Sequence, residues 1–353
     1  MKKAKVQIYW LLAVFSMGVF HSCQKVEIAG TPVKTELGTT ISKAVKLVTS
    51  TYEGAASENY TRGSQAQLII ITSRAQLVYA STSSTQDAVT AANNDLNTAI
   101  LVYEGKKVKQ IDPDNLVAQW TFDAVSQPSA GELIRDYTGN GHNAIMQRGH
   151  PLWGEGIVSI GTDRYEDAYR ALFFNLGANL EIPYSAALNA STMSISLWAK
   201  AIASTPIDNN QYMIALNRWN CFALKFQNTP KAQFTVNPAE SPGTLIIDDN
   251  GTTLSQGVWR HIVVTFGDGH MKFYVNGTLV KDAVHAGTII KQSPAVNLVI
   301  GQDLPTSSYS SAPVDPNYVN NGGFFKGYLD EIRIYKSVLT ATQVTSIYQL
   351  EKP

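Results

Sequence analysis

The sequence predicts a mainly β protein in which a small helical module precedes a larger antiparallel β domain. From Asn115 to Pro353, short alternating or continuously apolar runs are separated by turn signals, which is typical of a β-sandwich or jelly roll. Between residues 35 and 108, apolar residues instead recur at helical spacing. The run Asp112-Pro113-Asp114-Asn115 marks the change from one pattern to the other.

The amino terminus resembles a bacterial lipoprotein signal peptide. Three lysines precede an almost wholly apolar stretch over residues 6–20, which is shorter than the ~20 residues of a membrane-spanning helix. Cys23 follows a small residue, and in such signals the thiol receives lipid and cleavage occurs just before it. We therefore expect a signal peptide over 1–22, a lipid on Cys23 and a tether over 23–34. The alternatives are a transmembrane anchor, or a cleaved secretory signal with an incidental cysteine.

This resemblance implies a cell-envelope protein, held by its lipid at the outer membrane or cell surface of a Gram-negative bacterium. Lys+Arg and Asp+Glu both number 28, so no charge excess points to a nucleic-acid partner. Hydrophobic residues make up 44%, enough for a substantial core. Cys23 and Cys221 are the two cysteines. If Cys23 carries lipid, Cys221 has no partner, which excludes a disulfide framework and a cysteine-based metal site.

Three amphipathic helices are expected within residues 35–108, because three apolar stripes occur there: Ile41, Ala44, Val45, Val48 and Tyr52; Leu68, Ile71, Ala75 and Val78; Val89, Ala92, Leu96, Ala99 and Tyr103. Capping boxes are expected at 64–67 and 84–87. Short helices of this kind bury their apolar faces by packing into an antiparallel bundle. The segment resembles the three-helix FIVAR-type modules of bacterial surface proteins, through the runs Tyr60–Leu68 and Thr85–Ile100. Its expected role is a spacer.

Two pairs of turn residues predict β-hairpins in the second domain. Asn276-Gly277 follows an alternating run, and the pair suits the positive backbone angles of a tight turn. Asp249-Asn250-Gly251 follows a second apolar run. The more continuous apolar run from Trp259 to Phe266 is typical of a central strand.

Several motifs occur in the order found in one family: Trp120-Thr121-Phe122-Asp123, Asp136-Tyr137-Thr138-Gly139-Asn140-Gly141, Ser194-Ile195-Ser196-Leu197-Trp198, Trp259-Arg260-His261-Ile262-Val263, Tyr274-Val275-Asn276-Gly277 and Gly327-Tyr328-Leu329-Asp330-Glu331-Ile332. Through them, residues 115–353 resemble the laminin-G-like, concanavalin A-like lectin/glucanase jelly roll. The resemblance implies two packed antiparallel sheets. It also implies that the first and last strands are paired.

The same resemblance implies a candidate calcium site. Pairing of the first and last strands would bring Asp123 and Asp330 near a common point, and some members of the family bind calcium in this region. A hard cation needs several oxygen ligands, so Asp123, Asp136, Asn140 and Asp330 are the candidates. The alternative is that Asp330 and Glu331 cap a turn and pair with Arg135 or Arg333, and that residues 136–141 form a simple turn.

The sequence contains no recognisable catalytic motif. Family glucanases carry alternating acidic residues on one strand, which places their carboxylates on one face, and no such run occurs here. Neither G-x-S-x-G nor H-E-x-x-H occurs. The six histidines show no metal-ligand spacing, and His261 is expected to be structural. We therefore expect a protein that is not an enzyme.

Binding is the expected activity. Sugar sites use flat aromatic rings flanked by polar groups, and Trp219 lies between Arg218 and Asn220. The candidate ligand-binding residues are Trp219, Arg218, Tyr212 and Tyr309, the last of these in a long polar loop that begins at Thr306. For each aromatic residue the alternative is core packing.

We expect a lipid-anchored, non-catalytic carbohydrate-binding protein, with a glycan or an extracellular protein as partner. The alternative is a structural or adhesion module that binds protein, and the third reading is a glycoside hydrolase-related protein.

Overall fold

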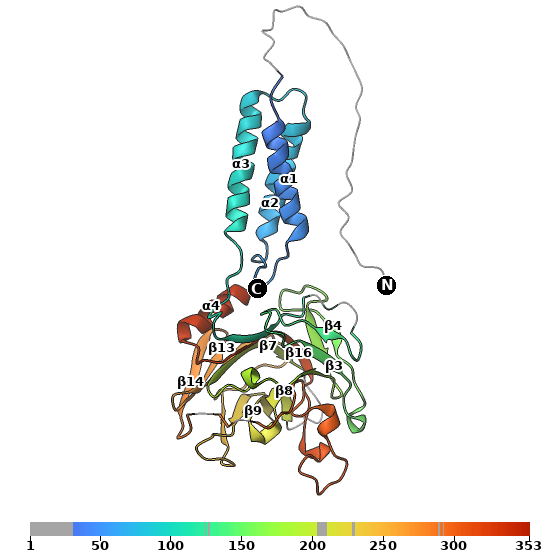
Figure 1. Cartoon of the computed structure of the whole chain (residues 1–353), viewed down its shortest axis with the longest axis vertical. Coiled ribbons are helices and arrows are strands. Elements are labelled where there is room, and N and C mark those ends of the chain that lie inside the picture. The colour runs from blue at the N-terminus through green and yellow to red at the C-terminus, as the bar shows by residue number, and fades with distance from the viewer. Residues whose placement is uncertain are drawn as a thin grey trace, which may run out of the picture.

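The computed structural model describes residues 31–353 apart from 124, 126–127, 203–209, 228–229, 289 and 292. The expected signal peptide, the lipid on Cys23 and most of the expected tether lie outside the described residues. Figure 1 shows a helical arm standing on a β domain. Among the described helices, none is both long and apolar enough to cross a membrane.

The arm consists of three helices, α1 (Thr35–Ser50), α2 (Ser64–Ala80) and α3 (Gln86–Glu104). They run alternately toward and away from the β domain (Figure 1). One apolar core joins them: Leu37, Ala44, Tyr60, Leu68, Ala75, Val89, Leu96, Ile100 and Tyr103. The Tyr60 and Tyr103 rings stack with centroids 4.1 Å apart at the end nearest the β domain.

The two predicted capping boxes differ in outcome. At 84–87 the helix has a side-chain cap but no reciprocal box: the Thr85 side chain accepts a hydrogen bond from the amide of Ala88. The box at 64–67 is wrong. Gly63 in the left-handed region (φ 80°) precedes α2 without a side-chain cap, and Gln65 instead donates to the Thr51 carbonyl.

Two antiparallel sheets form the β domain, so the predicted mainly β fold with two packed sheets is confirmed. Sheet 1 has the order β14-β13-β12-β7-β16-β5-β4, with β1 also paired to β16. Its strands are β1 (Leu116–Trp120), β4 (Ser159–Gly161), β5 (Ala171–Phe174), β7 (Met193–Ala201), β12 (Arg260–Gly267), β13 (His270–Val275), β14 (Thr278–Val284) and β16 (Gly327–Tyr335).

Sheet 2 has the order β11-β10-β9-β8-β15-β6-β3-β2. Its strands are β2 (Leu133–Ile134), β3 (Ala144–Gln147), β6 (Asn179–Ile182), β8 (Asn210–Leu216), β9 (Phe222–Gln227), β10 (Ala232–Val236), β11 (Ile246–Asp249) and β15 (Leu298–Ile300). Short 3-10 turns join several strands: η1 (Pro151–Trp153), η2 (Ala186–Leu188), η3 (Arg218–Asn220), η4 (Thr306–Ser308) and η5 (Val319–Asn321).

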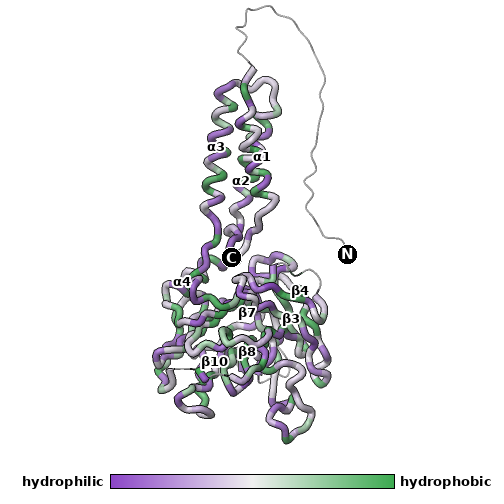
Figure 2. Tube along the Cα trace, viewed as in Figure 1, coloured by the Kyte–Doolittle hydropathy of each residue, from purple (hydrophilic) through white to green (hydrophobic). Residues whose placement is uncertain are grey.

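The main core lies between the sheets. Alternation along each strand sends one set of side chains inward, including Trp120, Phe174, Ile195, Phe222 and Phe266. Figure 2 shows hydrophobic residues along the central strands of the jelly roll, whereas polar and apolar residues alternate along the three helices of the arm. Cys221 is free and buried in this core, in agreement with its predicted apolar environment.

The expected pairing of the first and last strands is confirmed, because β1 pairs antiparallel with β16. The Asn276-Gly277 hairpin is also confirmed between β13 and β14, with φ angles of 48° and 77°. The hairpin predicted at Asp249-Asn250-Gly251 is wrong. There the chain leaves β11 at the edge of sheet 2 and crosses to β12 of sheet 1, and Asn250 Oδ1 accepts from the amide of Ala232.

A fourth helix, α4 (Ala341–Glu351), covers the outer face of sheet 1 near the base of the arm (Figure 1). Thr340 and Gln343 form its capping box. Val344 and Ile347 pack against Val263, Tyr274 and other side chains of that face. The outer face of sheet 2 lies on the other side of the jelly roll.

Candidate functional site

The four predicted binding residues lie together beside β8. Tyr212 belongs to β8, Arg218 and Trp219 belong to η3, which follows it, and Tyr309 follows η4. The Arg218 Cζ atom lies 5.1 Å from the centroid of the Trp219 ring and 5.7 Å from that of Tyr309. The Trp219 side chain also lies close enough to Tyr212 to affect the pKa of its phenol. The structure thus unites residues that are almost 100 positions apart.

Of these four residues, Trp219 alone is largely accessible, with an exposed fraction of 44%. Arg218 and Tyr212 are buried, and Tyr309 is half-buried. Tyr212 packs on Ala215 and Ala223, small residues of the outer face of sheet 2. The core-packing alternative therefore describes Tyr212, while Trp219 keeps the exposed ring that a sugar platform requires.

Arg218 and Tyr309 hold the long loop in place through Asp303. The Arg218 guanidinium forms a buried ion pair with Asp303, and it donates to the Pro316 carbonyl at 3.0 Å. The Tyr309 hydroxyl donates to the same carboxylate, as does the amide of Gly323 at 3.2 Å. A Cβ on Gly322 would come within 2.9 Å of Arg218 Nη2 and Asp303 Oδ1, so only glycine fits there. The loop over residues 302–324 is thereby fixed behind Trp219.

A second group of aromatic rings extends from Tyr309. Its ring centroid lies 4.9 Å from that of Trp153, which lies 5.2 Å from that of Phe324. These contacts are in the range at which aromatic pairs attract each other. The Trp219, Arg218, Tyr309 and Trp153 side chains thus form a continuous series of contacts, in which Tyr309 and Trp153 meet edge to face.

The phenols of this site remain protonated hydrogen-bonding groups. Burial raises the pKa of Tyr212, and the nearby Asp303 carboxylate raises it further. Burial and the same carboxylate raise the pKa of Tyr309 well above its ordinary value. Neither phenol is therefore poised for proton transfer near neutral pH.

The outer face of sheet 2 carries a row of side chains across neighbouring strands. Tyr212 is paired with Lys225, Lys225 with Gln233, and Gln233 with Asp249. Because side chains at paired positions point to the same face, this row starts next to Trp219 and crosses toward the sheet edge. The predicted set omitted Lys225 and Asp303. The alternation of Phe222, Leu224 and Phe226 with Lys225 could have placed Lys225 outside the core, whereas no local signal marks Asp303.

Two of the candidate calcium ligands instead hold a turn. Asp136 Oδ1 accepts from the amides of Gln119 at 3.1 Å and Thr138 at 3.0 Å, and Oδ2 accepts from the amide of His142 at 3.0 Å. Asn140 Nδ2 donates to the Val117 carbonyl at 2.9 Å. These bonds fasten the turn against β1, as the simple-turn alternative requires.

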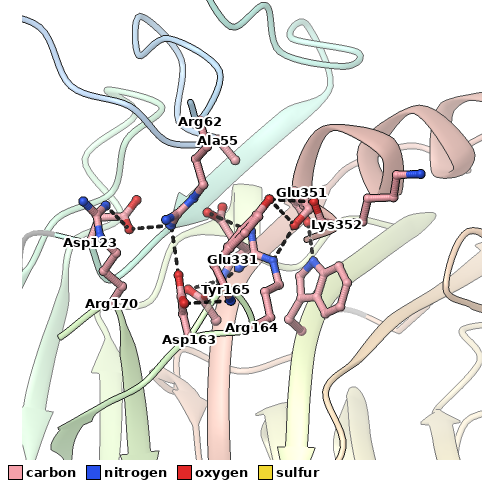
Figure 3. Close-up of polar contacts among 12 residues, drawn as sticks. Ala55, Arg62, Asp123, Asp163, Arg164, Tyr165, Arg170, Glu331, Glu351 and Lys352 are labelled. Atoms are coloured by element: carbon pink, nitrogen blue, oxygen red, sulfur yellow. Dashed lines mark hydrogen bonds and ion pairs between the residues drawn. The ribbon is translucent and has the colours of Figure 1, made fainter. Parts of the chain in front are cut away.

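The other two candidate ligands, Asp123 and Asp330, belong to a largely buried charge network, part of which is drawn in Figure 3. We call it the junction network, and it comprises Arg62, Asp123, Asp163, Arg164, Asp167, Arg170, Asp330, Glu331, Arg333 and Glu351. Asp330 is ion-paired with Arg164, and Asp123 lies 3.1 Å from Arg170 and 3.3 Å from Arg62.

Arginine side chains thus neutralise the carboxylates that a calcium ion would need. Across the described part of the chain, no group of three or more His, Cys, Asp or Glu residues is arranged to hold a metal ion. The residues present do not fit a calcium site, and the expected partner of Asp330 is also corrected. Arg164, rather than Arg135 or Arg333, pairs with Asp330, whereas Arg333 lies 3.6 Å from Glu331, as the alternative expected.

The junction network joins the helical arm to the jelly roll. Arg62, from the loop before α2, lies 3.0 Å from Asp163 and 2.8 Å from Asp167, and it stacks over the Tyr165 ring at 4.3 Å. Arg333 of β16 donates to the Ala55 carbonyl at 3.0 Å. The arm is therefore docked on the jelly roll through side chains from both parts.

Burial dominates the electrostatics of the network. It raises the pKa of Asp330 and of Glu331, and the neighbouring carboxylates reinforce both shifts. Burial, with the nearby Arg333 and Arg164, lowers the pKa of His261 to about 3, so this imidazole is neutral. His261 Nε2 lies 2.9 Å from Ser196 Oγ inside sheet 1. The histidine is structural, as the sequence suggested.

Residues 175–345 match the family model of the concanavalin A-like lectin/glucanases superfamily. The expected resemblance is therefore confirmed over this segment, which holds β8, η3 and the loop behind Trp219. The motifs around Trp120 and Asp136 lie before it. No curated protein matches the chain.

Solved structures with a similar fold share little sequence with this chain. Domain 4 of AbnA, an extracellular GH43 arabinanase from Geobacillus stearothermophilus solved with arabinotriose, is 18% identical, with a TM-score of 0.46; the match covers 67% of this chain and 98% of that one. The binding domain of Paraclostridial Mosquitocidal Protein 1 is 18% identical, with a TM-score of 0.47 and coverage of 67% and 52%. The ligand-binding domain of botulinum neurotoxin serotype D, solved with N-acetylneuraminic acid, is 16% identical, with a TM-score of 0.44 and coverage of 67% and 51%.

Proposed function

We propose that this protein is a lipid-anchored, non-catalytic carbohydrate-binding protein of the cell envelope. One observation supports the binding activity most directly. The Trp219 ring is exposed, while Arg218 and Tyr309 beside it are held by an ion pair and hydrogen bonds. A rigid aromatic surface loses little conformational entropy when a sugar ring stacks on it.

Polar groups beside Trp219 suit a hydroxylated ligand. Asn220 is exposed next to it, and Asn237 donates to the Trp219 carbonyl at 3.1 Å, which fixes the position of the turn. Amide side chains can both donate to and accept from sugar hydroxyls. The match of residues 175–345 to a superfamily of lectins and glucanases agrees with this proposal.

The layout of the chain suits display away from a membrane. The described chain begins at the end of the arm farthest from the jelly roll (Figure 1), which is where a lipid on Cys23 would attach. The helices of the arm, at 1.5 Å per residue, make it about 25 Å long. The arm docks on the sheet 1 side, so the Trp219 side of sheet 2 is left free. The arm then acts as a fixed spacer, and its resemblance to FIVAR modules is part of this proposal.

The non-catalytic reading is supported by the positions of the carboxylates. Asp303 is ion-paired with Arg218, whose guanidinium lies over the Trp219 ring. The adjacent acids Asp330 and Glu331 are buried in the junction network, where both face Arg164. A hydrolase of this superfamily would require two carboxylates that both face the substrate.

A glycan array tests the binding function. The full chain purified in detergent should bind defined glycans, and Trp219→Ala should weaken binding about 30-fold or more, because a central aromatic anchor contributes roughly 2 kcal/mol or more. Tyr169→Ala is the matched control, since Tyr169 is an exposed aromatic of the same domain in another loop. Equal binding by Trp219→Ala, or an array with no bound glycan, would refute the proposal.

Two further measurements test the remaining parts of the proposal. Mass spectrometry of the mature protein should show a lipid on Cys23, and Cys23→Ser should leave the protein in the aqueous phase of a detergent partition. Incubation with polysaccharides should release no sugar; sugar release that Asp303→Asn abolishes would overturn the non-catalytic reading.

A further inference from the structure

Lys225 is a largely buried cation next to the Trp219 platform. It lies on the outer face of sheet 2, directly paired with Tyr212 across β8 and β9. Its Nζ atom lies 5.0 Å from the centroid of the Tyr212 ring, and the Trp219 side chain lies beside the same tyrosine. A single side chain therefore connects the exposed platform with the ammonium group.

The ammonium group has no acidic partner among the described residues. Asn210 Oδ1, at 2.8 Å, is the one hydrogen-bond acceptor that the described part of the chain offers it. The face of the Tyr212 ring adds a cation–π contact, which is worth a modest amount. Burial lowers the pKa of Lys225, as expected for a cation that has lost water without gaining a carboxylate.

The neighbouring charges do not neutralise Lys225. Asp303 is the acid whose charge reaches it, but this carboxylate is already ion-paired with Arg218. Two cations and one carboxylate thus leave one positive charge in excess beside Trp219. A buried cation without a counter-ion is costly, and an anion that binds at this position would remove that cost.

We propose that the glycan bound at Trp219 is acidic, and that its carboxylate or sulfate group pairs with Lys225. This inference rests on the carbohydrate-binding function proposed above. The sugar ring stacks on Trp219, and the anionic substituent reaches across Tyr212 toward the ammonium group. The four-carbon stem of Lys225 lets the ammonium move toward the bound anion. Neutral glycans can use the platform but leave the cation unpaired.

The test uses the full chain in detergent on an array of paired glycans. Sialylated, uronic-acid-containing and sulfated glycans are printed beside their neutral parents, so that carboxylate and sulfate ligands are distinguished. We expect the acidic member of a bound pair to bind about tenfold or more tightly, in line with a charge-assisted hydrogen bond. The preference should weaken as NaCl rises from about 0.05 to 0.5 M.

Lys225→Met should abolish the preference while it retains the apolar stem that covers Tyr212. Lys225→Arg should retain it, which separates loss of charge from loss of folding. Lys231→Met is the matched control, because Lys231 is a nearby lysine that lies 3.8 Å from Asp249. An intact preference in Lys225→Met overturns the assignment.

Equal binding of acidic and neutral glycans, with both lost in Trp219→Ala, overturns the inference and leaves the proposed function standing. If the wild-type chain binds no glycan, both fail.

Discussion

Arg62 offers the sharpest test of how the arm is docked. Its guanidinium contacts Asp123, Asp163 and Asp167 and stacks on Tyr165. Arg62→Met keeps an unbranched apolar stem but removes the guanidinium and with it all three ion pairs. The Asp163 side chain is fully buried, so the substitution leaves a buried carboxylate without its counter-ion.

The magnitude follows from the burial of each pair. Breaking a buried ion pair by removing one partner costs about 3–5 kcal/mol. The pair with Asp167 adds little, because that carboxylate is half exposed. Arg62 is itself 17% exposed, and water that reaches the site reduces the cost. We expect the free energy of docking to fall by about 2–4 kcal/mol, a factor of roughly 30–1000 in the docking equilibrium.

A thiol placed at the junction measures this equilibrium. Ala55 is buried, and its carbonyl accepts from Arg333, so Ala55→Cys gives a thiol that reacts with a maleimide when the junction opens. In the Arg62→Met background its labelling rate should rise about 30-fold or more.

Lys43→Met is the control for the docking experiment, because it removes the exposed ion pair between Lys43 and Glu104 within the arm and should change the labelling rate by less than about threefold. If Arg62→Met and Lys43→Met give the same labelling rate, the docking role of the junction network is refuted.

Two further predictions concern titration and reactivity. The folded-state pKa of Glu331 is raised above its ordinary value of 4.5, so this group stabilises the fold below that pH, and its contribution is lost as pH rises through the folded pKa. The free energy of unfolding of Glu331→Gln, measured in urea, should therefore depend less on pH between about 5 and 8 than that of the wild type. Parallel pH profiles for the two proteins would contradict the shift. Burial raises the pKa of Cys221 to about 12, so its thiol should resist iodoacetamide at pH 8 in the folded protein and react in denaturant; rapid labelling of the folded protein would show that the core is open.

Local patterns in the sequence predicted the elements of the fold. The Trp259–Phe266 run became a strand within sheet 1, flanked by β7 and β13, and the Asn276-Gly277 pair became a hairpin because both residues adopt positive φ angles. The same type of signal failed at Asp249-Asn250-Gly251. A turn pair shows that a strand ends, but it does not show which sheet the next strand joins.

Predictions about the site were less complete because they depended on contacts between distant parts of the chain. Trp219 was identified by its polar neighbours, and it is the exposed aromatic of the group. Arg218 and Tyr309 were identified with it, yet both side chains bind the Asp303 carboxylate. No sequence motif around Asp303 marks it as part of the site. Lys225 is recognisable by strand alternation, but that no acid among the described residues pairs with it is visible only in three dimensions.

The sequence by itself determined where helices and strands occur, that the first and last strands of a resembling fold would pair, and that Cys221 has no disulfide partner if Cys23 carries lipid. Side-chain periodicity and residue counts are local properties, so they can be read along the chain. The tertiary structure alone decided which charges meet. Arg164 pairs with Asp330 across 166 positions, which leaves no place there for the expected calcium ion. Ion pairing depends on distance in space and on burial, and neither can be predicted from the spacing of residues along the chain.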